Sequence, residues 1–339
     1  MRLDELDYEL PPELIAQHPA AERDDSRLMV LDRRSGALEH SRFRRLGRHL
    51  SEGDLLVIND TRVFPARLFA RKESGGRVEL LMVRPVTDPP GGWIALMRAH
   101  HAPKPGSHLV LDSGARLRII RYDRPGRPVL AGENGRSVDD LIWTHGRLAL
   151  PHYIEREPEP EDFGAYQTVY AAQTGAIAAP TAGLHFTPAL LDELQAAGIR
   201  VARLTLHIGP GTFVPIRSVE VEAHSMEAEW YTIPDAARGA IELARRTGGR
   251  IIAVGTSSVR ALESFAITGD SEGETGLFIA PGFRFRLVDA MITNFHMPRS
   301  TVLAMVMAFA GRDLVLNAYR EAIRRRYRFL SYGDAMLIL

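Results

Sequence analysis

The feature of this sequence that most constrains its fold is a long stretch made of strand-like segments. From about Ala66 to Arg136, short alternating or apolar runs are separated by Gly, Pro, Asp and Ser turns, as in ARLFARK, RVELLMVRPV, WIALMRAHH, SHLVLD and ARLRIIRYD. Strands at this spacing are typical of a small antiparallel barrel or sandwich. Ser137 to His145 has the pattern of a short amphipathic helix, which we expect to close this unit.

The rest of the chain alternates strands with helices. A buried-type strand at Asp54 to Ile58 precedes the all-β stretch, and Thr187-Pro188 opens one of several later helices. This alternation predicts an α/β layer architecture. Because it continues on both sides of the all-β stretch, we expect a main α/β domain with a barrel-like β domain inserted in it. The expected domains are residues 1–68 plus 152–339 for the main domain and 69–151 for the insert.

Length and composition exclude several classes of protein. The 339 residues suggest roughly two domains. The longest apolar run, Val302 to Ala310, is far shorter than the roughly 20 residues of a membrane-spanning helix, so we expect no membrane segment. The N-terminus lacks the features of a signal peptide, which favours the cytoplasm. The absence of cysteine excludes disulfides, zinc-thiolate sites and cysteine nucleophiles.

The overall charge is balanced, with 42 basic and 42 acidic residues. Balance argues against indiscriminate nucleic-acid binding but does not exclude a local basic face. Two arginine-rich stretches are candidates for such a face, although charge runs of this kind also form the ordinary solvated side of a helix. They comprise Arg42, Arg44, Arg45 and Arg48, and Arg320, Arg324, Arg325, Arg326 and Arg328.

Polar residues cluster where strands are expected to end, while several common catalytic motifs are absent. The chain has no glycine-rich dinucleotide or phosphate-binding motif, no H-E-x-x-H and no G-x-S-x-G. These absences argue against a standard NTPase, zinc protease or serine hydrolase. The clusters contain Asn59, Asp60, Thr61, Arg62, Thr181, His185, His207, Thr212, His224, Asn294 and His296.

The segment Gly255 to Arg260 predicts a strand that turns into a helix through Thr256, Ser257 and Ser258. Free backbone N–H groups and the positive dipole end at such a helix start form a site for an anion or a carboxylate. The alternative interpretation is that Ser257 or Ser258 is merely an N-cap.

Four histidines, His185, His207, His224 and His296, lie near expected strand ends. Histidine titrates near neutrality, so these side chains are candidate proton carriers. Each one is alternatively a hydrogen-bonded structural residue. No two of them have the spacing of metal ligands, so we expect no metal site.

Taken together, the clusters resemble a known family. The motifs VINDTRVFPARL, YQTVYA, GAIAAPTAGLHFTPALL, LTLHIGPGTFVPIR, IIAVGTSSVRALES, ITNFHMPRSTVLAMVMAFAG and YRFLSYGDAM occur in the order found in the S-adenosylmethionine:tRNA ribosyltransferase-isomerases of queuosine biosynthesis. The opening DYELPPELIAQHPAAERDDSRL is similar to the start of that family as well. The resemblance extends from about residue 4 to the C-terminus.

The resemblance implies a specific reaction. The ribosyl part of S-adenosylmethionine is moved onto 7-aminomethyl-7-deazaguanine at the tRNA wobble position and rearranged, giving epoxyqueuosine-tRNA, adenine and methionine. S-adenosylmethionine is then a consumed substrate, and no retained cofactor is expected. The partners would be the anticodon region of tRNA and S-adenosylmethionine, and we expect a monomer.

The implied chemistry needs groups that the sequence offers. The proton transfers favour the four histidines, which the sequence does not rank. The methionine carboxylate needs donors, which Arg260 or the helix start at Thr256 to Ser258 would supply. Asn59, Asp60, Thr61 and Asn294 are candidates for the ribose hydroxyls and the purine edge.

Two other functions remain open from the residues alone. One is a non-catalytic RNA-binding protein that binds through the β insert. The other is a different S-adenosylmethionine-consuming transferase that acts on a small molecule and needs no basic patch.

Overall fold

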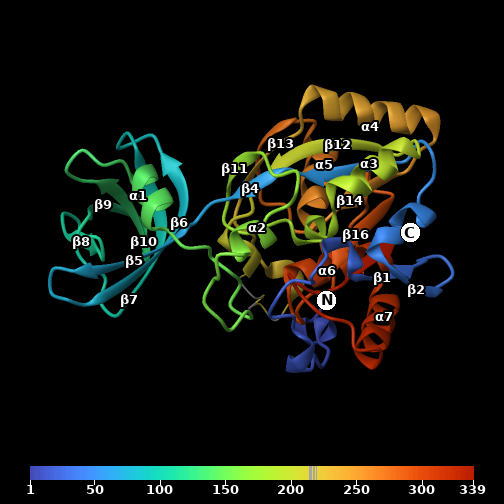
Figure 1. The fold of residues 1–339 in the computed structure, drawn as a ribbon, viewed down its shortest axis with the longest axis horizontal. Coiled ribbons are helices and arrows are strands. Elements are labelled where there is room, and N and C mark those ends of the chain that lie inside the picture. Colours follow the sequence, from blue (N-terminus) through green and yellow to red (C-terminus); the bar gives the residue numbers. More distant parts are fainter. Residues whose placement is uncertain (214–215, 217, 219) are drawn as a thin grey trace.

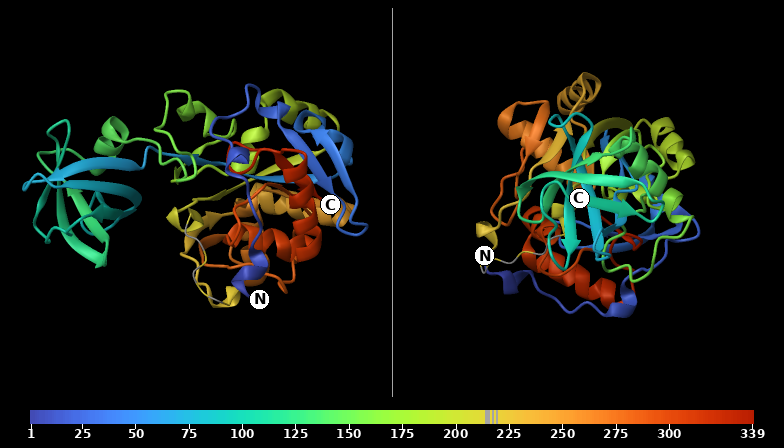
Figure 2. Two further views of the ribbon diagram at one scale, coloured as in Figure 1. Left: turned by 90° about the horizontal axis from the view of Figure 1, so that it is seen from below. Right: turned by 90° about the vertical axis from the view of Figure 1, so that its left-hand side faces the viewer.

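The computed structural model describes residues 1–213, 216, 218 and 220–339. It confirms an α/β body with an inserted antiparallel β-barrel. Figure 1 shows the barrel standing beside the body, with short connecting segments between the two. The left-hand view of Figure 2 shows the same separation.

A nine-stranded mixed sheet forms the centre of the body, in the order β15-β13-β12-β3-β14-β16-β17-β1-β2. β12, β3, β14 and β16 run parallel to one another, while β17 and β13 pair antiparallel to β16 and β12. The strands of this sheet are β1 (Arg27–Leu31), β2 (Leu38–Arg42), β3 (Leu55–Asn59), β12 (Arg200–Leu206), β13 (Glu229–Thr232), β14 (Ile251–Val254), β15 (Glu272–Thr275), β16 (Ala290–Asn294) and β17 (Ala335–Ile338).

Helices cover both faces of this sheet because its central strands are apolar on both sides. In β3, Leu55 and Val57 pack into one buried cluster with α4 to α7, whereas Leu56 and Ile58 pack into another with η4, η5 and α3. The α-helices of the body are α2 (Asp162–Ala165), α3 (Pro188–Ala196), α4 (Asp235–Thr247), α5 (Thr256–Thr268), α6 (Thr301–Ala310) and α7 (Arg312–Arg324). The 3-10 helices are η1 (Leu3–Leu6), η2 (Pro12–Leu14), η3 (Arg23–Asp25), η4 (Phe43–His49), η5 (Thr181–His185), η6 (Pro210–Phe213) and η7 (Val221–Ala223).

The barrel is closed, with strand order β10-β7-β6-β5-β8-β9. Alternate residues of each strand, such as Leu68, Leu80, Leu109 and Leu117, fill its interior and are fully buried. Helix α1 (Val138–His145) packs against the barrel core, as expected from the sequence. The barrel strands are β5 (Arg67–Lys72), β6 (Arg77–Val86), β7 (Gly92–Ala99), β8 (His108–Leu111), β9 (Arg116–Arg124) and β10 (Arg127–Gly132).

The chain enters and leaves the barrel at one point. The backbones of Arg67 and Arg147 pair with each other through two hydrogen bonds of 3.0 and 2.8 Å. On the body side, β4 (Thr61–Val63) pairs in parallel with β11 (Gln173–Ala176). The domain limits of 68/69 and 151/152 remain a prediction.

Two helix starts follow the capping chemistry of the sequence. Ser137 accepts from the backbone N–H of Asp140 at the start of α1, and Thr187 accepts from that of Leu190 at the start of α3. In the described part of the chain, no single helix is long and apolar enough to cross a membrane. Only α6 and α7 taken together have the length and composition, and they are bent by 113°.

Candidate active site

The functional side chains meet at one edge of the sheet. β12, β3, β14 and β16 are parallel, so their carboxyl ends lie together. Asn59 and Asn294 are the last residues of β3 and β16, and His207 and Gly255 follow β12 and β14 directly. Ligands of open α/β sheets bind at this edge.

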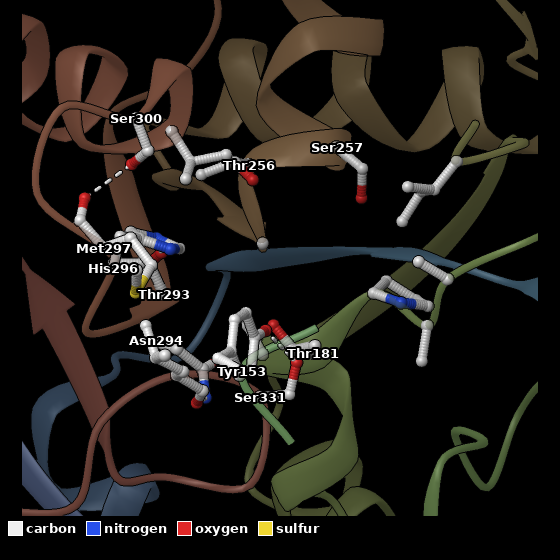
Figure 3. A pocket seen from close by; sticks show the side chains of 18 of the residues that line it. Tyr153, Thr181, Thr256, Ser257, Thr293, Asn294, His296, Met297, Ser300 and Ser331 are labelled. Carbon is white, nitrogen blue, oxygen red and sulfur yellow. Dashed lines mark hydrogen bonds between the residues drawn. The ribbon is translucent and has the colours of Figure 1, made fainter. Parts of the chain in front are cut away.

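A cavity of about 200 Å³ opens at these strand ends. In Figure 3, Thr256 and Ser257 of α5 face Thr181, Tyr153 and Ser331 across it, and His296 and Thr293 close one end. Its polar lining residues are His152, Tyr153, Thr181, Thr256, Ser257, Thr293, Asn294, His296, Ser300 and Ser331.

The start of α5 points uncapped backbone toward this cavity. Its N-cap residue is Gly255, at φ 86°, and no side chain caps the helix. Ser258 instead donates to the carbonyl of Val254 (2.7 Å), and Ser257 Oγ accepts from Asn59 (3.0 Å). The interpretation of either serine as an N-cap is therefore wrong, and no side chain of the described residues accepts from the first N–H groups of the helix.

Asn59 joins several elements at this edge of the sheet through hydrogen bonds. Its Nδ2 donates to the carbonyl of Leu206 (2.9 Å) and to Ser257, while its Oδ1 accepts from the backbone N–H groups of Leu206 (3.0 Å) and Thr61 (3.1 Å). All its hydrogen-bonding capacity is used, so it fixes β3, β12 and α5 relative to one another.

The residues that follow Asn59 point away from the cavity. Asp60 is buried and accepts from Thr205 Oγ1 (2.6 Å), and burial raises the pKa of its carboxyl. Thr61 bonds to His207, and Arg62 is exposed on β4. None of these three lines the cavity at the strand ends.

His296 is the one predicted histidine that lines this cavity. Its Nε2 lies 2.7 Å from Thr293 Oγ1, and its backbone N–H donates to Tyr319 Oη (3.0 Å). Burial lowers the pKa of the ring to about 4. The imidazole is therefore neutral at pH 7 and carries a lone pair.

His185 lies behind Asn294 and not on the cavity wall. Its Nδ1 is 2.7 Å from Ser26 Oγ and its Nε2 is 3.3 Å from Asn294 Nδ2, which also donates to the carbonyl of Leu330 (3.0 Å). Because an amide NH₂ only donates, Nε2 accepts and Nδ1 carries the proton. Burial, with smaller effects from nearby arginines, lowers the pKa of His185 to about 4.

The other two predicted histidines lie elsewhere. His207 Nδ1 is 2.8 Å from Thr61 Oγ1, and its ring stacks on Trp230 with centroids 5.1 Å apart. It faces a cleft of about 940 Å³ between the body and the barrel. His224 packs edge-on against Phe278. Burial lowers the pKa of both rings.

Arg260 is held by a buried carboxylate. Its guanidinium forms an ion pair with Glu229 and donates to the carbonyl of Thr275 (3.1 Å). Both members of the pair lie next to a smaller cavity, which shares Thr256 and Ser257 with the main one. The side chain of Thr212, in η6, lies outside the described residues.

Several cavity residues were not singled out in the sequence. Tyr153 donates to or accepts from Ser331 (2.7 Å), and burial raises its pKa to about 12. Ser331 lies in the motif YRFLSYGDAM, next to Tyr332 and close to Asp334. Those two bind Asp162 (2.7 Å) and Arg27 (3.0 Å) and stabilise the fold.

Comparison with known proteins identifies the family. The model of the family described as "Queuosine biosynthesis protein" matches residues 3–338, so the chain belongs to that family. Its relatives include proteins named "S-adenosylmethionine:tRNA ribosyltransferase-isomerase". The chain is 50% identical to that of Citrifermentans bemidjiense over 343 residues, covering 100% of both proteins. It is 52% identical to that of Rubrobacter xylanophilus over 339 residues, covering 100% of this chain and 98% of the relative.

A solved structure agrees with this assignment. The crystal structure of S-adenosylmethionine tRNA ribosyltransferase from Thermotoga maritima matches with a TM-score of 0.58 and 40% identity, over 99% of this chain and 100% of the other. The family and the enzyme class that the motifs predicted are confirmed.

Proposed function

We propose that this protein transfers and isomerises the ribosyl group of S-adenosylmethionine onto 7-aminomethyl-7-deazaguanine at the wobble position of tRNA. The products are epoxyqueuosine-tRNA, adenine and methionine. The observation that carries the proposal is the cavity at the strand ends, with polar side chains in its wall, of a chain that matches this family over residues 3–338. The proposal needs one copy of the chain, no metal and no retained cofactor, and it places the reaction in the cytoplasm with its tRNA.

The uncapped start of α5 is suited to the methionine carboxylate. Its free N–H groups and dipole favour an anion, and Thr256 and Ser257 line both the main cavity and the smaller one beside Arg260. Because Arg260 is already paired with Glu229, we assign the direct hydrogen bonds to the helix start. The positive charge of the Arg260 guanidinium then favours the carboxylate from its position next to the site.

His296 is the best-placed proton carrier. The sulfonium acidifies the neighbouring 5′ carbon, and a base must take its proton. Among the described residues, the only hydrogen bond of the His296 ring joins Nε2 to Thr293, which leaves Nδ1 for the substrate. A ring kept neutral at pH 7 is in the protonation state that this step requires.

His185, His207 and His224 do not line the cavity, so we do not assign the proton transfers to them. His185 orients Asn294, which does line it and remains a candidate for the purine edge or the ribose hydroxyls. His207 lines the cleft beside the barrel, and its Nδ1 lies within hydrogen-bond distance of Thr61 Oγ1.

The test is one incubation with purified protein, S-adenosylmethionine and tRNA that carries 7-aminomethyl-7-deazaguanine. Nucleoside mass spectrometry of the digested tRNA should show epoxyqueuosine, with adenine and methionine released. Binding of tRNA without product would favour a binding protein. Consumption of S-adenosylmethionine with unchanged tRNA would indicate another acceptor.

The same assay tests the role of His296. His296→Gln should lower the turnover rate by about 10²- to 10⁴-fold, the usual contribution of a general acid or base. His18→Gln is the matched control, because the His18 side chain is 60% exposed and lies outside the cavity. Equal rates for His296→Gln and the wild type would remove this residue from the mechanism.

A further inference from the structure

The charge of the chain is balanced overall but is distributed unevenly between the barrel and the rest of the protein. Residues 67–132, which span the six barrel strands, contain 12 Arg and Lys against 5 Asp and Glu. The remainder of the chain therefore has 30 basic and 37 acidic residues. The barrel segment has a formal charge of +7 and the rest of the protein −7.

Part of this positive charge forms a row across the outer face of the barrel. Arg77 of β6 lies directly opposite Arg71 of β5, Arg71 lies opposite Val110 of β8, and Val110 lies opposite Arg116 of β9. Neighbouring strands are about 4.8 Å apart, so the three guanidinium groups span four adjacent strands. All three arginines are exposed.

These arginines lack the carboxylate partners that surface arginines often have. Arg71, Arg77 and Arg116 form no ion pair with any residue that the structure describes. Like charges directly opposite each other on paired strands destabilise a sheet. The row of arginines therefore does not contribute to the stability of the fold.

The row borders a groove that also offers an aromatic surface. The groove has a volume of about 610 Å³, and its charged and aromatic lining consists of Arg71, Arg77, Arg98, Arg147, His100 and Phe69 together with the carboxylates Glu79 and Asp112. Phe69 is partly exposed, with the guanidinium of Arg147 5.3 Å above its ring. Guanidinium forks next to an aromatic ring are suited to phosphates and bases.

The arginine-rich stretches of the body differ from this row. Arg42 and Arg44 pair with Asp25, and Arg324 and Arg325 pair with Glu321. Asp25 and Glu321 offset only part of the charge of the nine arginines in these stretches, whereas the barrel row has no carboxylate partner among the described residues.

We propose that the outer face of the barrel formed by Arg71, Arg77 and Arg116 binds the phosphate backbone of RNA. This inference rests on the proposed function, in which that RNA is the substrate tRNA. The cavity at the strand ends accommodates only a small part of a tRNA, so most of the affinity must come from contacts elsewhere. Phosphate contacts by arginine are the usual source of such affinity.

The test compares two triple variants that remove the same charge. The first is Arg71→Gln, Arg77→Gln, Arg116→Gln on the barrel. The control is Arg34→Gln, Arg246→Gln, Arg284→Gln, three exposed arginines of the body. Affinity for the tRNA that carries 7-aminomethyl-7-deazaguanine is measured by fluorescence anisotropy between about 50 and 200 mM salt, where counterion release is pronounced.

The barrel variant should bind tRNA about tenfold or more weakly at physiological salt, and its slope of log K against log salt should decrease by about 3, one unit for each lost phosphate contact. The control should keep the wild-type slope. An unchanged slope in the barrel variant would overturn the inference and point to another partner, such as an acidic protein. Equal losses in both variants would overturn it as well, because only total charge would matter.

The proposed function is judged separately, by epoxyqueuosine formation in the wild type. Wild-type product with an unchanged barrel variant would reject the RNA surface alone. A wild type that binds tRNA through the barrel but yields no product would reject the activity alone. Thermal unfolding of both variants verifies that they are folded.

Discussion

The environment of His185 predicts a measurable loss of stability in acid. The ring is 4% exposed, is hydrogen-bonded at both nitrogens, and has its pKa lowered to about 4. In the unfolded chain an ordinary histidine has a pKa of about 6.5. Between these values the unfolded state binds the proton and the folded state does not, so the contribution is complete above pH 6.5 and is lost as the pH falls toward 4.

The magnitude follows from the two pKa values. One pH unit in this window corresponds to about 1.4 kcal/mol for a single group. At pH 5, about 1.5 units below the unfolded pKa, His185 should have lowered the free energy of unfolding by about 2 kcal/mol relative to neutral pH.

The assay is urea unfolding of the wild type and His185→Gln at pH 7.5 and pH 5. Glutamine retains an acceptor for Asn294 but does not titrate, so the difference in free energy between the two pH values should be about 2 kcal/mol smaller in the variant. Other titrating groups contribute equally to both proteins and cancel. The exposed His18→Gln should behave as the wild type. If the free energy of unfolding changed by the same amount between the two pH values in the wild type and in His185→Gln, the conclusion that the fold keeps this ring neutral would be refuted.

Three further changes test other features of the structure. Glu229→Gln should lower the free energy of unfolding by about 3–5 kcal/mol, because it leaves the charge of Arg260 buried without its partner; adding Arg260→Met should restore part of that loss in urea unfolding. Arg71→Thr should raise the free energy of unfolding by about 0.2–1 kcal/mol by relieving the repulsion from Arg77, and a decrease would contradict the proposed row. Glu227→Gln removes two ion pairs between body and barrel and should broaden the distribution of distances between spin labels on α4 and on the barrel, whereas an unchanged distribution would show that these pairs do not hold the barrel. The absence of native cysteine makes this labelling straightforward.

Much of the architecture could be predicted from the sequence, because its periodicities are clear. The helix starts at Thr187 and Ser137 and the strand ends at Asn59 and Asn294 agree with the structure. β17 was not predicted, although it lies inside the sheet between β16 and β1. It is a short apolar run at the chain end, Ala335–Ile338, where length and period do not distinguish strand from helix.

The sixth barrel strand, β10, is not among the segments named from the sequence, and Pro128 lies within it. Proline is rare in strand interiors and argues against a strand when only the sequence is known. Here the residue lies next to a register shift between β10 and β9, which relieves the loss of its N–H group.

Sequence reasoning selected four histidines but did not rank them. Their spacing contains no information on which rings reach a common cavity, since that depends on packing between strands far apart in sequence. His296 lines the cavity, whereas His185 does not, because Asn294 lies between the His185 ring and the cavity. Tyr153 and Ser331 could not be predicted from the sequence for the same reason, since they are 178 residues apart in the chain.

Because the chain enters and leaves the inserted barrel at one point, the barrel and the body fold in a set order during synthesis on the ribosome. Each barrel strand finds its neighbours within residues 67–132 and α1 follows directly, so the barrel and its covering helix emerge before most of the body. β3, which precedes it, pairs with β12 and β14 and must wait for Arg200 and Ile251. At about 5–20 residues per second, the roughly 140 residues between β3 and β12 take about 7–28 seconds to synthesise. During that interval the nascent chain displays a finished, positively charged barrel next to an apolar strand that has no partner.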